Sequence, residues 1–531
     1  MRHSILSRLS LVACLGAAAS SCSSSPTSSG ASLPSSDPPP LERAGGTVDA
    51  SKLDLLLMID DSISMRDKQE LLRDAIPRFV ARIVADGTVN DVHVGVVSSS
   101  LGSAGASSCT RPEENGHAHL VDAAASKAPF LSWTRGASDP EALTADLVAR
   151  IGAMTESGCG YEAQLESWYR FLVQPDPAED IRVAAGSVTT EAGVDDTILA
   201  QRKAFLRPDS KVVITMLTDE NDSNVDPLAF GGRAWFFTEP QHVKPGTSAC
   251  EVDPFSDACT SCYLAAAVGD PRCTTPLTDK TDHPNVRFFD MRRRFGVDPR
   301  FPLSRYIEGL TAERVSDRTT EHPKDEHGLP SFSYVGKAKC TNPLFASALP
   351  ASSQDETCNL KLGPRTRDDV LFVVIGGIPS DLVPAGSDGS PVSLDAAAWS
   401  RALTDPRMTE SIGQRPGVAD DRDSHSMDLQ FACTFPLATP RDCSALSPTS
   451  PSGGACDCLG DTASPLCAAN PANGGKPTLQ VAAKAYPSLR ELVVARALGD
   501  NALVGSLCPT DRGVGVGPAL DAVAARLARR P

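Results

Sequence analysis

Residues 51–65, SKLDLLLMIDDSISM, join an apolar run to a polar turn. The run at 55–59, with Leu53 just ahead of it, suits a strand buried on both faces, as in a parallel sheet covered by helices. The turn carries one carboxylate and two hydroxyls in a D-x-S-x-S pattern, at Asp60, Ser62 and Ser64. It lies at the carboxyl end of the predicted strand, where open α/β sheets usually bind ligands. Oxygen donors of this kind suit Mg²⁺, Mn²⁺ or Ca²⁺ better than Zn²⁺.

Strand-like and helix-like segments alternate along much of the chain. Apolar residues at helical spacing predict a helix over 71–83, directly after the polar turn. Further buried strands are predicted at 92–97, 211–217, 369–377 and 502–508, with a short edge strand at 117–121. Further helices are predicted at 139–154, 163–173, 195–206, 489–498 and 518–528. This order predicts an α/β fold with a doubly wound, mostly parallel sheet.

A second polar pair, Thr218-Asp219, ends the strand predicted at 211–217. Together with the D-x-S-x-S turn, it resembles the von Willebrand factor A (vWA) family and its metal-ion-dependent adhesion site (MIDAS). The resemblance implies a Rossmann-like vWA sheet whose site binds Mg²⁺, or Mn²⁺ or Ca²⁺. It implies that Asp219 acts through water, and that the ion is held directly by Asp60, Ser62 and Ser64. It also implies an open metal position, which the acidic residue of a protein partner fills.

In the vWA family a third loop supplies a threonine ligand, and this chain departs from that pattern. Thr155, Ser157 and Glu162 are all candidates for the position, and Thr155 is the one that we assign to it. Cys159 lies nearest to the aligned threonine, but a thiol is a poor ligand for Mg²⁺. We therefore expect Cys159 to form a disulfide, with Cys109 as the candidate partner. Glu162 as an extra ligand would weaken the pull of the ion on an acidic partner and favour a structural ion.

The N-terminus is typical of a bacterial lipoprotein. Residues 1–21 combine two arginines with a short apolar segment, as a signal peptide does. They lead to Ala-Ser-Ser-Cys at 19–22, which resembles a lipobox with Cys22 as the acylated residue. A rival lipobox ends at Cys14, but cleavage there would leave almost no hydrophobic segment. Ser23 favours the outer membrane, with the mature protein facing the periplasm or the surface.

Composition agrees with export and argues against nucleic acid as a partner. The net charge of -16 repels phosphate backbones and anionic membrane surfaces. No later stretch approaches the ~18 apolar residues of a spanning helix, so we expect membrane contact through the lipid anchor alone. Of the 16 cysteines, those other than Cys14 and Cys22 are even in number and can form up to seven disulfides outside the cytosol.

These features predict one vWA domain opened by two Cys-rich, irregular insertions. The domain begins at 51–224, resumes as a strand at 365–379 and closes with a helix, a strand and a helix at 484–531. The insertions span 225–364 and 380–483, and a Ser-, Pro- and Gly-rich tether spans 22–50. The alternative is a separate Cys-rich C-terminal domain. Solvated loops are expected around His322 and His327, and around the acidic residues Asp420, Asp421, Asp423 and Asp428.

The sequence lacks the local motifs of common enzymes, such as a nucleophile elbow, a P-loop or HExxH. We therefore predict a protein that is not an enzyme. The favoured function is a cell-envelope lipoprotein that binds a protein partner through a divalent metal ion. The alternative is a vWA scaffold of an envelope assembly, with a structural or vestigial metal site.

Overall fold

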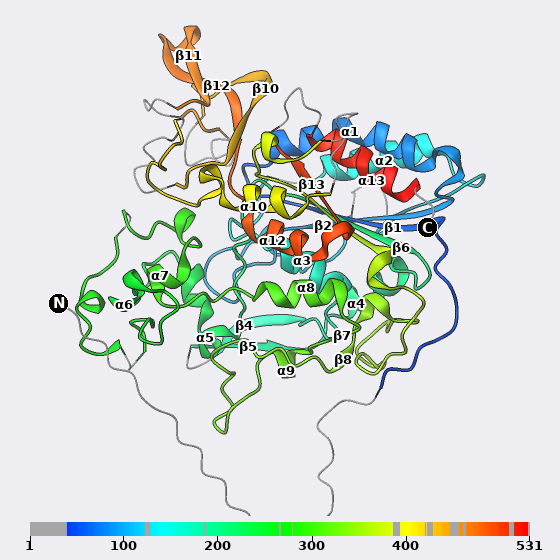
Figure 1. Cartoon of the computed structure of the whole chain (residues 1–531), viewed down its shortest axis with the longest axis horizontal. Helices are drawn as coiled ribbons and strands as arrows, with labels where there is room; N and C mark the ends of the chain where they lie inside the picture. Colours follow the sequence, from blue (N-terminus) through cyan, green and yellow to red (C-terminus); the bar gives the residue numbers. More distant parts are fainter. Residues whose placement is uncertain are drawn as a thin grey trace, which may run out of the picture. The chain divides into compact units, whose positions relative to one another are not determined.

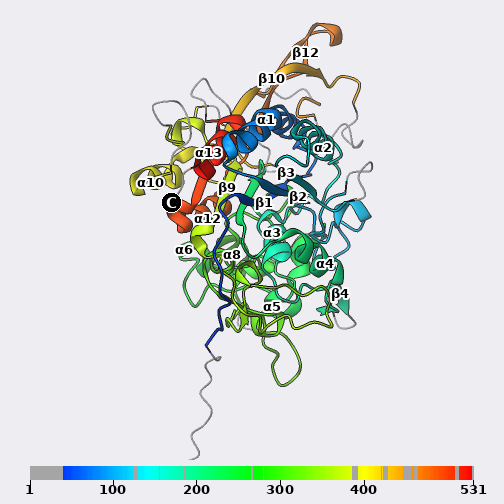
Figure 2. The ribbon, with the colours of Figure 1, turned by 90° about the vertical axis from the view of Figure 1, so that its right-hand side faces the viewer.

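A six-stranded sheet forms the centre of the computed structural model (Figures 1 and 2). Its order is β13-β9-β6-β1-β2-β3, and every pair is parallel except β2 with β3. The strands are β1 (Lys52–Ile59), β2 (Asp91–Ser98), β3 (Leu131–Thr134), β6 (Lys211–Leu217), β9 (Val370–Gly376) and β13 (Ala502–Ser506). The predicted α/β class with a mostly parallel sheet is confirmed.

The structure describes residues 40–528 apart from short internal gaps. These are 123–127, 155, 185–186, 265–266, 279, 386–392, 420, 422–427, 447–455, 460–463 and 509–513, and the side chain of residue 86. Cys22 and Thr155 therefore lie outside the described residues. The described residues from Leu41 onward form one compact unit.

Helices cover both faces of the sheet. One face packs against α1 (Arg66–Val84), α2 (Pro140–Gly152) and α13 (Val516–Ala528). The other packs against α3 (Gln164–Leu172), α4 (Asp196–Phe205), α8 (Leu303–Thr311) and α12 (Leu489–Leu498). Alternate residues of β1 enter opposite cores: Leu55 and Leu57 face α1, whereas Leu56 and Met58 face α3. The continuous apolar run is explained by this burial on both faces.

The predicted edge strand over residues 117–121 is wrong. His117 and Ala118 have φ angles of 54° and 63°, which lie outside the extended region. The edge is β3 instead, which runs antiparallel to β2. β3 alternates buried and exposed side chains, with Trp133 buried, as a strand with one solvated face does.

The insertions are more regular than predicted. The second contains a three-stranded antiparallel sheet made of β10 (Cys433–Asp442), β12 (Lys476–Ala485) and β11 (Cys467–Asn470), after α10 (Ala396–Thr404). The first holds α8 and the short elements α5 (Ala229–Gly232), α6 (Ala249–Val252), α7 (Met291–Phe295), β7 (Arg314–Val315), α9 (Arg318–Glu321) and β8 (Cys340–Thr341). Ahead of both, β4 (Asp180–Ala184) and β5 (Val188–Ala192) form a hairpin.

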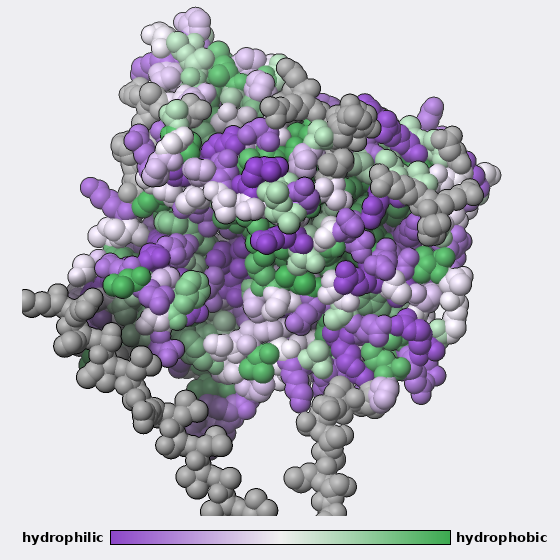
Figure 3. Space-filling model, viewed as in Figure 1, coloured by the Kyte–Doolittle hydropathy of each residue, from purple (hydrophilic) through white to green (hydrophobic). Residues whose placement is uncertain are grey.

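All fourteen cysteines of the described residues are paired. The disulfides are Cys109–Cys159, Cys250–Cys259, Cys262–Cys273, Cys340–Cys358, Cys433–Cys508, Cys443–Cys456 and Cys458–Cys467. The expected pairing of Cys109 with Cys159 is confirmed. Among the described residues, no helix has both the length and the apolar character needed to cross a bilayer. Hydrophilic and hydrophobic side chains are interspersed on the face shown in Figure 3.

Candidate cation-binding site

The predicted polar turns meet at one edge of the sheet, between β1 and β6. The chain passes from β1 to β2 on one side and later returns to β6 on the other, so the strand order reverses here. Asp60 follows β1, and Thr218 and Asp219 follow β6. The backbone N–H of Asp60 donates to the carbonyl of Leu217 at 2.9 Å, which locks the two strand ends together. In open α/β sheets this reversal point is the usual ligand site.

The carboxylate of Asp60 is fully buried and is held by three donors. Its Oδ1 accepts from the backbone N–H of Ser62 at 2.9 Å and from the hydroxyl of Ser99 at 3.0 Å. Its Oδ2 accepts from the hydroxyl of Thr218 at 2.7 Å. The side chain is therefore fixed toward the D-x-S-x-S turn. Ser99, at the end of β2, was not predicted as part of the site.

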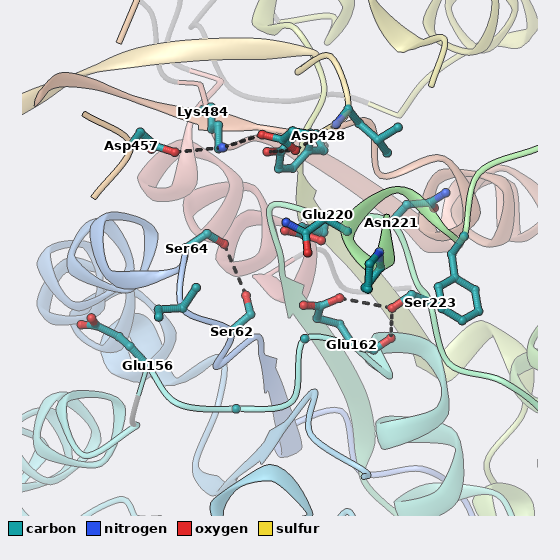
Figure 4. A pocket seen from close by; sticks show the side chains of 18 of the residues that line it. Ser62, Ser64, Glu156, Glu162, Glu220, Asn221, Ser223, Asp428, Asp457 and Lys484 are labelled. Carbon is teal, nitrogen blue, oxygen red and sulfur yellow. Dashed lines mark hydrogen bonds and ion pairs between the residues drawn. The ribbon is translucent and has the colours of Figure 1, made fainter. Parts of the chain in front are cut away.

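Ser64 connects this turn to the second aspartate. Its hydroxyl donates to Asp219 Oδ1 at 2.9 Å and lies 3.3 Å from the hydroxyl of Ser62 (Figure 4). The other oxygen of Asp219 is 2.8 Å from the ammonium of Lys68, which also donates to the carbonyl of Ser64 at 2.8 Å. Sequence reasoning missed Lys68, although its place one helical turn after Ser64 was the available signal.

Of the predicted third-loop candidates, Ser157 and Glu162 both line the site. Cys159 is bound to Cys109 and is therefore not a ligand, as predicted. Glu162 is buried, and its Oε2 accepts from the hydroxyl of Ser223 at 3.2 Å. Figure 4 shows its carboxylate facing that of Glu220, the residue next to Asp219. The sequence offered both acidic residues, but the fold was needed to show that they face each other.

The site concentrates acidic side chains in a confined space. Burial, and then repulsion from Glu220 and Asp60, raises the pKa of Glu162 well above the usual range. Burial, and then repulsion from Asp219, Asp60 and Asp428, does the same to the pKa of Glu220. Burial also raises the pKa of Asp60, with repulsion from Asp219 as the next cause. These shifts follow from packing carboxylates together with few cations, and a bound cation would offset them.

A cavity of about 570 Å³ opens above these groups. Among the described residues that line it, two are basic, Arg111 and Lys484, and seven are acidic: Asp67, Glu156, Glu162, Glu220, Glu410, Asp428 and Asp457. Its upper wall comes from the second insertion, where Lys484 lies 2.9 Å from Asp457 and 3.3 Å from Asp428 (Figure 4). Phe288 and Phe289 of the first insertion add an aromatic side.

No protein-family model matches the chain, and no curated protein or solved structure matches it. The nature of the site therefore rests on its donor groups. Carboxylate and hydroxyl oxygens converge there, with no thiol or imidazole among the described lining residues. This donor set fits Mg²⁺, Mn²⁺ or Ca²⁺ better than Zn²⁺.

The acidic loop of the second insertion is not simply solvated, contrary to the prediction. Asp428 lines the cavity and accepts a hydrogen bond from the hydroxyl of Tyr486 at 2.6 Å. Asp421 is an ion-pair partner of the buried Arg415 at 2.6 Å. The loop differs from the expectation because basic side chains pair with its acids: Arg415, six residues away, pairs with Asp421, and Lys484, 56 residues away, pairs with Asp428. Asp420 and Asp423 lie outside the described residues.

His322 was also expected in a solvated loop, and it is buried instead. Its Nε2 lies 2.6 Å from Asp226, and its Nδ1 lies 3.1 Å from the hydroxyl of Ser331. This resembles a catalytic triad only in composition, because the hydroxyl of Ser331 donates to the carbonyl of Ser333. His327 is exposed, as expected. The charged Asp226 partner explains the burial of His322.

A second group of metal-binding residue types lies in the first insertion. Ligand atoms of Asp317, Cys340 and Cys358 are all within 4.8 Å of one another. Cys340 and Cys358 form a disulfide, which leaves no thiolate to bind an ion. The edge of the central sheet is therefore the stronger candidate.

Proposed function

We propose that the chain is a vWA-type binding module of a cell-envelope lipoprotein, which binds a protein partner through a divalent cation, Mg²⁺ or else Mn²⁺ or Ca²⁺. The observation that carries the proposal is the convergence of one D-x-S-x-S turn with the aspartate of a neighbouring strand end. Ser64 and Asp219, 155 residues apart, share a hydrogen bond of 2.9 Å there.

Each part of the site has a role under this proposal. Asp60, Ser62 and Ser64 would hold the ion, and Asp219 would orient Ser64 or contact the ion through water. Glu162 would stand where the vWA family has its threonine. The ion would supply a positive centre that the carboxylate of a partner protein contacts. The cavity above it offers room for a side chain of the partner.

Export is supported independently of the metal. Seven disulfides among the described residues suit an oxidising compartment and are rare in the cytosol. The signal-like residues 1–21 and the lipobox at Cys22 add a route to the outer membrane. Lipid attached at Cys22 would join the chain to the bilayer through the predicted tether. The described end of that segment is not free, because the backbone N–H of Ala44 donates to the carbonyl of Leu362 at 2.7 Å.

Calorimetric titration of the full chain with Mg²⁺, Mn²⁺ and Ca²⁺ tests the proposal. Asp60→Asn keeps the size of the side chain but removes its charge, so it should abolish saturable binding. Asp209→Asn is the matched control, because Asp209 pairs with Lys52 at the opposite end of β1. Binding that survives in Asp60→Asn would place the ion elsewhere.

A scaffold with a structural ion is the second candidate, and the extra acidic side chains favour it. Glu162 and Glu220 add negative charge beside the ion, and this weakens its pull on an acidic partner. Peptides that carry one aspartate, compared with the same peptides carrying asparagine, separate the two candidates. Binding that needs both the aspartate and Mg²⁺ supports partner capture, whereas ion binding with no peptide preference supports the scaffold.

A further inference from the structure

Lys68 occupies a position that is unfavourable for a lysine by two local criteria. It is the third residue of α1, in the first turn, where the helix dipole favours negative and not positive side chains. Its side chain is only 2% exposed, so its ammonium has lost most of its contact with water. A cation in such a place requires a specific partner.

The partner is the second aspartate of the candidate metal site. Lys68 Nζ lies 2.8 Å from Asp219 Oδ2 and 2.8 Å from the carbonyl oxygen of Ser64. Asp219 is fully buried, and its Oδ1 accepts from the hydroxyl of Ser64. One carboxylate is therefore shared between a built-in ammonium and the turn that would hold the ion.

We propose that Lys68 is a built-in counter-ion of the site, which stabilises it without metal and lowers its affinity for divalent cations. The inference rests on the proposed metal-binding function and adds a regulatory residue to it. Without an ion, the ammonium neutralises Asp219 and keeps the end of β6 joined to the first turn of α1. When an ion binds, it meets a fixed positive charge held against the same carboxylate.

Two electrostatic consequences follow from this arrangement. Like charges a few ångströms apart in a buried site repel strongly, so Lys68 restricts ion binding to high ion concentration. The carboxylates on the other side, Glu162 and Glu220, have no basic residue within ion-pair distance among the described residues. An ion that binds nearer to Glu162 and Glu220 would neutralise their carboxylates, while Lys68 stays paired with Asp219.

The test compares the full-length wild type with Lys68→Met, which keeps the length of the side chain and removes its charge. Calorimetric titration should show Mg²⁺ and Mn²⁺ affinity raised by roughly tenfold or more. In EDTA the variant should have a lower thermal midpoint than the wild type, because Asp219 is left buried without a counter-ion. Saturating Mg²⁺ should reduce that difference.

Two further variants keep the result interpretable. Lys68→Gln can still donate to Asp219 without a charge and serves if Lys68→Met does not fold. It should also raise the ion affinity. Lys52→Met removes a lysine that pairs with Asp209 at the opposite end of β1, and its ion affinity should equal that of the wild type.

The outcomes separate this inference from the proposed function. Unchanged affinity in both Lys68 variants overturns the role of Lys68 and leaves the metal-binding function standing. Ion binding in the variants but not in the wild type supports Lys68 as a counter-ion and overturns metal-dependent binding by the natural chain. Absence of binding in all variants overturns both.

Discussion

At the scale of single residues, Gly377 permits an unusually close backbone approach. It directly follows β9, and a Cβ placed there would lie 1.6 Å from the carbonyl oxygen of Tyr486. The backbone N–H of Tyr486 in turn donates to the carbonyl of Asp219 at 2.7 Å. A side chain at Gly377 would therefore push the end of β12 away from the candidate site.

Gly377→Ala should lower the free energy of unfolding by about 3 kcal/mol, the upper range for overpacking a tight site. Gly413→Ala is the matched control, because no atom lies within 4 Å of its added Cβ. Urea titrations of both variants measure the difference. Equal stability of the two would show that the backbone near Tyr486 moves without difficulty.

Glu491 on α12 is a buried acid whose ionisation depends on the fold. Burial, and then repulsion from Asp222, raises the pKa of Glu491 from 4.5 to about 8. The folded protein thus retains a proton that the unfolded chain releases, and stability falls as the pH rises from about 4.5 to about 8.

Glu491→Gln should remove this loss of stability. Its free energy of unfolding at pH 9 should exceed that of the wild type by up to roughly 5 kcal/mol, relative to their difference at pH 4. Denaturant titrations at both pH values measure it, with the exposed Glu326→Gln as control. A parallel pH dependence in all three proteins would contradict a protonated Glu491.

The site residues that follow β1 and β6 were predictable from the sequence, but the cavity residues that come from the insertions were not. Asp60, Ser62, Ser64 and Asp219 were predictable because each belongs to a strand end, and parallel strands end at one edge. Lys484 and Asp428 were not, since they are 56 residues apart and meet through insertion packing. Lys68 was missed because the helix was predicted from the apolar residues over 71–83, and Lys68 lies ahead of them in the first turn of α1.

At the scale of elements, the Cys109–Cys159 disulfide fixes the third loop of the site. It ties the loop after β2 to the segment that leads to Glu162 and α3. Backbone contacts continue this attachment: the N–H of Gly158 donates to the carbonyl of Asp61 at 3.0 Å. The loop is thus held covalently on one side and by the site itself on the other.

Replacing both cysteines by serine should loosen this loop. The disulfide closes 50 residues, for which the loss of unfolded-state restriction predicts a decrease of about 4 kcal/mol in stability. If Glu162 contributes to the site, the ion affinity should also fall. Melting curves and calorimetry on Cys109→Ser/Cys159→Ser measure the two effects. The same double change at Cys340 and Cys358, in the first insertion, should leave the ion affinity intact.

The elements with strong periodic patterns of apolar residues were predicted well. Strands whose regularity depends on pairing with a neighbouring strand were not. The predicted strand at 211–217 and helix at 489–498 match β6 and α12 in their bounds. β10 escaped prediction because it mixes Pro436 and polar residues and gains its regularity from pairing with β12. Disulfides stabilise its surroundings without leaving an apolar signature in the sequence.

At the scale of the whole molecule, the disulfides and the predicted lipid anchor are both features of proteins exported from the cytosol. Cys22→Ser should abolish incorporation of labelled fatty acid in cells and release the protein from the membrane fraction, because the lipid on Cys22 is the only predicted membrane attachment. Cys14→Ser is the control and should leave labelling unchanged. Labelling that persists in Cys22→Ser but disappears in Cys14→Ser would favour the rival lipobox.

The turns after β1 and β6 form the base of the cavity, and the two insertions form its rim. The strands β6 and β9 each lead into an insertion, and both insertions contribute to the walls of the cavity. Closing a longer loop is inexpensive in entropy, about 0.6 kcal/mol for each doubling of its length. The rim can therefore be lengthened, shortened or rewritten with little strain on the sheet, so that choice of ligand and stability of the fold become nearly independent properties of one chain.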